Sequence, residues 1–290
     1  MSVAHATGAQ AAAAVPAGPR AGGTRRLRVR PRLWRVTIFV LALLFFIGPL
    51  VCAFKFSLIE QNGRYGLDNY AQIVKNADLR SALVTSLEIS AITSVVIVVL
   101  TLPTVVLVRL KLPRLVIVMD TVTLLPLVIP PVVMAVGLEH LQGNAPGWLD
   151  PLFNSPLTGL APFYVILAMP LVYRAIDTGV QAFDLHTMVE ASRSLGAGWV
   201  ATLWRVVLPN VRTAVLGGMF LTVALCLGEV VLASFLLYTT FPTQIIVASQ
   251  GTNANLSVAL SLISLAFTFV LLFVLSFFAG RRGAQSFRVM

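Results

Sequence analysis

Uncharged apolar runs of about 20 residues constrain this chain more than any other feature. The first of them, Val36–Phe54, holds no charge over its whole length. A helix needs about 20 mostly apolar residues to cross the hydrocarbon core of a bilayer. Over the full sequence 58% of the residues are hydrophobic and 11% are charged, whereas about a quarter are charged in a soluble domain. Too little polar surface remains to cover a water-soluble fold, so we predict an all-α membrane protein.

Six apolar runs are long enough to span a membrane. They are Val36–Phe54, Ser81–Val108, Leu115–Leu138, Pro156–Tyr173, Thr213–Thr239 and Leu256–Ala279. The first is longer than the apolar region of a signal peptide, which has about 7–15 residues, and Lys55 follows it in place of a small-residue cleavage site. We therefore expect a retained span. The predicted organisation is a disordered basic tail over residues 1–32, a transmembrane domain over 33–282 and a C-terminal tail over 283–290.

Basic residues are distributed unevenly around these spans. Six spans place both termini on one side, and taking that side as the inside leaves few of the 21 Lys and Arg residues in outer loops: Lys55, Arg64, Lys75 and Arg80. Basic residues beside membrane spans stay on the cytoplasmic side. The pattern predicts a multi-pass protein of the cell (inner or plasma) membrane with both termini in the cytoplasm.

The net charge of +10 does not indicate a nucleic-acid partner. The basic residues lie in short clusters between long uncharged runs and are not interleaved with exposed aromatic residues. Cys52 and Cys226 fall inside apolar runs without CxxC spacing, and the histidines His5, His140 and His186 are scattered. This composition predicts no metal site and no disulfide framework.

Prolines interrupt several of the predicted spans: Pro103, Pro126, Pro130, Pro131 and Pro170. Each removes a backbone donor and tends to kink its helix, which neighbouring helices or a wet cavity can tolerate. Two interpretations stay open. The prolines reflect irregular helix packing, or they mark broken helices that line a translocation path.

A polar segment between the fourth and fifth spans carries the most specific pattern. Thr187 and Glu190 stand three residues apart, which is the spacing of a capping box with Thr187 at the start of a helix. Met188, Ala191 and Leu195 then share one face at helical spacing. Gly196 suits a left-handed helix end, and Pro209 suits the start of the next element. We predict a short amphipathic helix at the membrane surface.

The same segment resembles the permeases of ATP-binding-cassette importers. Their cytoplasmic motif reads Glu-Ala-Ala, three residues, Gly, nine residues, Ile, any residue, Leu-Pro. The matching positions are Glu190, Ala191, Gly196, Leu208 and Pro209. Ser192 replaces the second Ala and Val206 replaces Ile, both close in size and shape. The resemblance includes the order of six spans and extends over about residues 34–282.

The resemblance implies that the segment docks on an ATPase and couples it to transport. The matching residues are then coupling residues, although Glu190 acting only as a cap and Gly196 only as a helix stop remains a compatible interpretation. The chain has no Gly-x-x-x-x-Gly-Lys-Ser/Thr loop, so ATP would be hydrolysed by a partner subunit and the chain itself would not be an enzyme. The implied partners are two copies of an ATPase subunit, a second permease (identical or homologous), an extracytoplasmic substrate-binding protein and membrane lipid.

Three acidic residues lie within the apolar runs. A carboxylate at the bilayer centre costs roughly 2.5–3.5 kcal/mol on insertion scales, so it should face protein or a wet path. Asp120 lies near the inner end of the third span, where a structural role is favoured. Glu88 is balanced between the two roles. Glu229 lies deep in the fifth span and is predicted, with Glu88, to belong to the substrate path.

Within the importer family the chain resembles most the branch of polyamine permeases, with ferric-iron and phosphonate permeases as relatives. The similar stretches are Ser86–Ser90, Pro126–Pro131 and Leu227–Glu229. The expected substrate is therefore a polyamine such as spermidine or putrescine, with a sugar as the alternative. A secondary transporter without an ATPase is a further alternative, but no internal repeat is evident and the spacing from Glu190 to Pro209 would be unexplained. A membrane-embedded enzyme is less favoured because no catalytic constellation is found.

Overall fold

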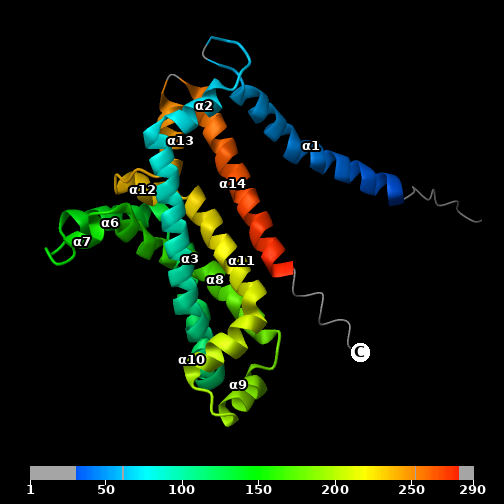
Figure 1. The fold of residues 1–290 in the computed structure, drawn as a ribbon, viewed down its shortest axis with the longest axis vertical. Helices are drawn as coiled ribbons and strands as arrows, with labels where there is room; N and C mark the ends of the chain where they lie inside the picture. Colours follow the sequence, from blue (N-terminus) through cyan, green and yellow to red (C-terminus); the bar gives the residue numbers. More distant parts are fainter. Residues whose placement is uncertain (1–30, 61, 252, 281–290) are drawn as a thin grey trace, which may run out of the picture. The chain divides into compact units, whose positions relative to one another are not determined.

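The computed structural model describes residues 31–60, 62–251 and 253–280, and in these ranges every regular element is a helix (Figure 1). The all-α prediction is confirmed. The long helices are α1 (Pro31–Ser57), α3 (Ala77–Lys111), α8 (Pro156–Gln181), α11 (Leu208–Gly228) and α14 (Ala254–Gly280). The short ones are α2 (Asp68–Lys75), η1 (Pro113–Leu115), α4 (Val116–Val122), α5 (Leu125–Val128), α6 (Pro131–Gly143), α7 (Asp150–Phe153), α9 (Leu185–Ser194), α10 (Trp199–Thr202), η2 (Leu203–Val207), α12 (Val231–Phe235) and α13 (Phe241–Gln250).

The chain divides into two units, residues 1–49 and 50–290. The predicted basic tail over 1–32 lies almost wholly outside the described residues, and the tail over 283–290 lies wholly outside them. In the first unit α1 presents apolar side chains on all sides, among them Trp34, Phe39, Leu44 and Phe45, each at least 67% exposed. A helix that is apolar all round needs lipid or a partner to cover it.

Five described helical segments are long and apolar enough to cross a membrane, and a bent pair makes a sixth if it counts as one span. The five are Trp34–Ser57, Ala77–Lys111, Pro156–Gln181, Trp199–Gly228 and Ala254–Leu271. The pair is 113–128 with 131–143, bent by 86°. These segments correspond to the six predicted runs, and the third is broken where a continuous span was expected.

The break in the third run lies at adjacent prolines. Ile129 and Pro130 are extended, with ψ of 121° and 134°, and Pro131 starts α6. A residue before proline is pushed out of the helical region, so two successive prolines stop the helix. Pro103 and Pro170, by contrast, remain inside α3 and α8. Only part of the proline set therefore breaks a helix.

The fifth run also ends earlier than predicted. Helix α11 stops at Gly228, and Glu229 is extended at φ −82° and ψ 118°, so the expected continuation to Thr239 is wrong. The chain then forms α12, turns at Leu237 with a left-handed φ of 59° and enters α13. The backbone amide of Phe241 donates to Ser86 Oγ on α3 at 2.8 Å, which fixes the start of α13. Because these residues are as apolar as a span, hydropathy does not reveal the break.

Helices α3, α8 and α11 form the largest core of the second unit. Small residues allow close approach between α8 and α11: a Cβ added at Gly179 would collide with the Cβ of Ala214, and one at Gly218 would meet Val172 at 3.2 Å. Such small residues let membrane helices pack at short range. In Figure 1, α9 and α10 lie at one end of α3, and α2 and α13 lie at the other. The segment with the predicted motif is therefore held at one end of the helical bundle.

Candidate functional site

The motif helix α9 begins three residues earlier than the capping-box prediction placed it. Asp184 is its N-cap and accepts a hydrogen bond from the backbone amide of Thr187 at 3.2 Å and another from the Thr187 hydroxyl at 2.7 Å. Both bonds lower the pKa of Asp184, and the bond from the Thr187 hydroxyl has the larger effect. The prediction that Thr187 caps through the amide of Glu190 is wrong, because Thr187 already lies in the first turn.

Gly196 ends α9 in the left-handed conformation that the pattern predicted, with φ of +84°. The amide of Ala197 donates to the carbonyl of Ser192 at 3.2 Å, and the amide of Gly196 donates to that of Arg193 at 2.9 Å. This pair of bonds is a Schellman motif, which satisfies carbonyls at the helix end. A side chain at position 196 would meet open space, so the constraint on this residue comes from the backbone alone.

The motif residues of α9 lie on its outward face. Leu185, Val189 and Ser192 are buried, whereas Glu190 and Ala191 are exposed. Leu195, next to Gly196, is 89% exposed, and Met188 is half-buried. The face that the sequence predicted as apolar therefore points away from the bundle. Ala191 and Leu195 are therefore free to contact another protein.

The second half of the motif lies in the elements that follow α9. Val207 and Val189 belong to one hydrophobic cluster, against which Leu208 also packs, so the structure brings the two halves together. Helix η2 is a π-helix, in which the amide of Leu208 donates to the carbonyl of Leu203. Pro209 follows in the first turn of α11. The wider turn suits this proline, whose ring would otherwise meet a carbonyl four residues earlier.

Ser192, the first departure from the family motif, has a partner of its own. Its hydroxyl lies 3.0 Å from the hydroxyl of Thr202 on α10, and both residues are buried. A family alanine at this position could not form this bond. The serine therefore adds a polar link between α9 and the element that leads into α11.

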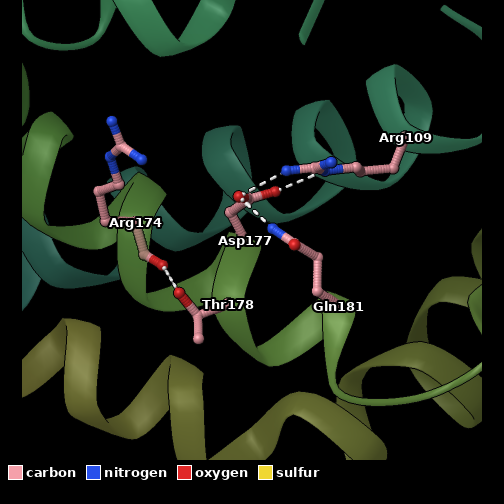
Figure 2. A network of polar contacts seen from close by, with 5 residues as sticks. All are labelled: Arg109, Arg174, Asp177, Thr178 and Gln181. Carbon is pink, nitrogen blue, oxygen red and sulfur yellow. Dashed lines mark hydrogen bonds and ion pairs between the residues drawn. The ribbon is translucent and has the colours of Figure 1, made fainter. Parts of the chain in front are cut away.

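A buried ion pair joins α3 to α8 near the same end of the bundle (Figure 2). The Nε and Nη2 atoms of Arg109 donate to the two carboxylate oxygens of Asp177, each at 2.7 Å, and Gln181 Nε2 donates to Asp177 Oδ2 at 2.7 Å. The Asp177 side chain is 6% exposed and that of Arg109 is 27% exposed. Bidentate pairs of this kind fix geometry as well as charge. Sequence reasoning missed Asp177, since it placed this residue in the loop after a span ending at Tyr173.

The three acidic residues singled out in the sequence have different surroundings. Glu229 Oε1 accepts from the amides of Val231 at 2.7 Å and Leu232 at 3.0 Å, so this carboxylate caps the turn into α12. Glu88 is exposed on α3. Asp120 on α4 has a buried Oδ1 without a hydrogen-bond partner among the described residues. Glu229 is therefore at a helix break rather than inside a helix.

The apolar helical segments define a multi-pass membrane protein, and α9 connects the segment formed by α8 to the one that ends with α11. Residues 89–283 match the family described as binding-protein-dependent transport system inner membrane component. The chain belongs to this family. The matched region contains every residue of the predicted motif.

Several similar proteins are permeases named for molybdenum or sulfate. The chain is 32% identical over 256 residues to a probable molybdenum ABC transporter permease protein of Haloferax volcanii. The aligned region covers 84% of this chain and 91% of that protein. The chain is 35% identical over 112 residues to the sulfate transport system permease protein CysW of Synechococcus elongatus, covering 36% of this chain and 38% of that protein. It is 30% identical over 118 residues to the molybdenum transport system permease protein ModB of Escherichia coli K12, covering 38% and 51%.

These comparisons support the assignment of the chain to the importer permeases, but they do not support its assignment to the polyamine branch. The stretches on which that branch was based, such as Leu227–Glu229, are short and apolar apart from one acidic residue. Leu227–Glu229 lies at the end of α11, where the Glu229 carboxylate caps the turn into α12, so its acidic residue does not indicate a cationic substrate. The expectation of a polyamine substrate is therefore not supported.

Proposed function

We propose that this chain is the membrane subunit of an ATP-driven importer for a tetrahedral oxyanion, molybdate or sulfate. The observation that supports this most is the relative from Haloferax volcanii, which is 32% identical over 84% of the chain and is named for molybdenum. The shorter match to the sulfate permease protein CysW points to the same class of ion.

The state of Glu229 is compatible with an anionic substrate. A free carboxylate in the path would repel an oxyanion, but this one accepts two backbone amides, which compensate part of its charge. We propose that Glu229 shapes the path by holding the turn between α11 and α12. By the same argument an exposed carboxylate at Glu88 on α3 would repel an oxyanion, so we propose that Glu88 lies outside the path.

Coupling to the ATPase is proposed to occur through the outward face of α9. Glu190, Ala191 and Leu195 are exposed there, and Gly196 ends the helix so that this face projects from the bundle. The full transporter would contain two ATPase subunits, a second permease subunit and a binding protein. The ATPase would lie on the side of the membrane that contains α9, which we propose is the cytoplasm because most basic residues lie on that side.

The orientation is tested with reporter fusions. Fusions after Asn253 and within 144–150 are expected to report the outside, and one after Arg282 the inside. An outside signal after Arg282 would contradict the six-span arrangement.

The substrate is tested by uptake into proteoliposomes that contain the purified transporter, its binding protein and internal ATP. We expect ATP-dependent uptake of radiolabelled molybdate or sulfate, each competed by the other, and no uptake of putrescine. Uptake of putrescine without uptake of either oxyanion would refute the substrate and leave the family membership intact.

A further inference from the structure

Two basic side chains from distant parts of the chain converge on one aromatic ring. Lys111 Nζ and Arg193 Cζ each lie 4.9 Å from the centroid of the Trp199 ring. Lys111 ends α3, Arg193 lies in the last turn of α9 and Trp199 starts α10. Within the described ranges the ion pairs are Arg109–Asp177 and His186–Glu190, so neither of these two cations is neutralised by a carboxylate. The ring attracts both cations but carries no net charge, which leaves the site positive.

An apolar groove begins at the same tryptophan. A hollow of 240 Å³ is lined by Pro103, Val106, Leu107, Trp199, Val200 and Leu203. A second hollow of 420 Å³ shares Pro103 and Leu203 with it and continues along α3 to Val95. Leu107 is 43% exposed and Val200 is 72% exposed, so the groove is open at the surface of the bundle.

The length of the groove along α3 is close to the thickness of the hydrocarbon layer of one membrane leaflet. From Leu107 to Val95 the helix rises about 18 Å at 1.5 Å per residue. Half of a bilayer's hydrocarbon core is about 15 Å. Both α3 and the segment that starts at Trp199 are apolar enough to span the membrane. Lys111 is the last residue of α3, and Arg193 of α9 lies over the ring of Trp199, the first residue of the second segment. The charged end of the groove therefore falls at the level of the lipid headgroups.

We propose that this site binds one anionic phospholipid. The phosphate lies beside Lys111 and Arg193, and an acyl chain follows the groove from Leu107 toward Val95. A transmembrane helix of another subunit would fill an apolar groove but would leave two cations uncompensated, and a soluble protein would not enter a groove at membrane depth. Because Arg193 belongs to α9 and Lys111 to α3, the bound lipid would fasten the motif helix to the second span.

The direct test is lipid retention by the intact transporter. We expect native mass spectrometry to show phosphatidylglycerol bound in preference to phosphatidylcholine. Each basic group near an anionic lipid contributes roughly a fivefold gain in affinity, so Lys111→Gln with Arg193→Gln should lower phosphatidylglycerol affinity about thirtyfold. The matched control is Lys75→Gln with Arg80→Gln, which removes the same charge at the other end of α3 and should leave binding unchanged. Equal retention of both lipids by the wild type, or unchanged retention by the first double variant, would overturn the proposal.

A second experiment identifies the occupant of the groove. A photo-crosslinking benzoylphenylalanine at Leu107, in an otherwise unchanged transporter, is expected to form a phospholipid adduct. An adduct to a peptide of another subunit, or the absence of a lipid adduct, would overturn the assignment. Neither readout depends on the proposed substrate or on ATPase coupling. Absence of oxyanion uptake by the wild-type transporter would refute the proposed function. The lipid-retention measurement would still test the lipid site independently.

Discussion

Replacing Gly196 tests whether the shape of the end of α9 controls docking of the ATPase. The φ of +84° costs an ordinary L-residue about 1–2 kcal/mol, and a β-branched residue more. A new Cβ would meet nothing within 4 Å, so no steric clash adds to this cost. If docking requires the observed helix end, Gly196→Ala should weaken it by a factor of about 5–30. Gly196→Val should weaken it further, and Gly196→Asn should weaken it least because Asn tolerates this region.

The assay measures the affinity of the purified permease, in mild detergent, for its ATPase subunit and the stimulated rate of ATP hydrolysis. Gly198 provides the matched control, since its φ of −72° suits any L-residue and its Cβ position is equally open. Gly198→Ala should therefore be neutral. Wild-type affinity and stimulation in Gly196→Ala would refute the coupling role of this helix end. An equal loss in both alanine variants would show that general crowding, not the left-handed conformation, is responsible.

Three further outcomes are expected. Glu229→Gln keeps an acceptor for the amides at the start of α12 and should support near-normal uptake. Glu229→Ala removes the acceptor and should lower the free energy of unfolding by about 0.5–2 kcal/mol and slow uptake; an equal loss of uptake in both variants would favour a role for the charge instead. Asp177→Asn should lower the melting temperature in detergent, with a loss of stability of about 1–3 kcal/mol given the partial exposure of Arg109. The double variant Arg109→Leu with Asp177→Leu should recover part of this stability. An unchanged melting temperature in Asp177→Asn would contradict a structural role. Gly179→Ala should destabilise the α8–α11 contact by about 1–3 kcal/mol. Gly217→Ala should not, because a Cβ at position 217 would meet open space. Equal melting temperatures for the two variants would contradict this packing.

Local features of the motif segment could be predicted from the sequence. The left-handed end at Gly196 follows from residue chemistry within a few positions, and this prediction is confirmed. Pro209 lies in the first turn of α11 as its chemistry suggests, but the helical run that contains it begins ten residues earlier at Trp199, so the proline does not start a new helix. The start of α9 was misplaced because Asp184 and Thr187 are both good caps, and only the folded chain decides between them. The coupling role of the segment stays a prediction.

Tertiary features could not be predicted from one sequence. Arg109 and Asp177 are 68 positions apart, and nothing local to either marks the other as its partner. The end of α11 at Gly228 was hidden because α12 and its surroundings are as apolar as a span. The bend before Pro131 was only half visible, since Pro103 and Pro170 carry the same local signal without breaking their helices.

The π-turn between α10 and α11 has a consequence for the length of the chain. A turn closed by the bond from Leu208 to Leu203 contains one residue more than an α-turn. Deleting one residue between positions 203 and 207 would convert it to an ordinary turn while α11 keeps its angular relation to α8. A deletion inside α11 would instead rotate every later side chain by about 100° and move its small residues off the α8 contact. A one-residue deletion should therefore be tolerated better at this turn than within α11.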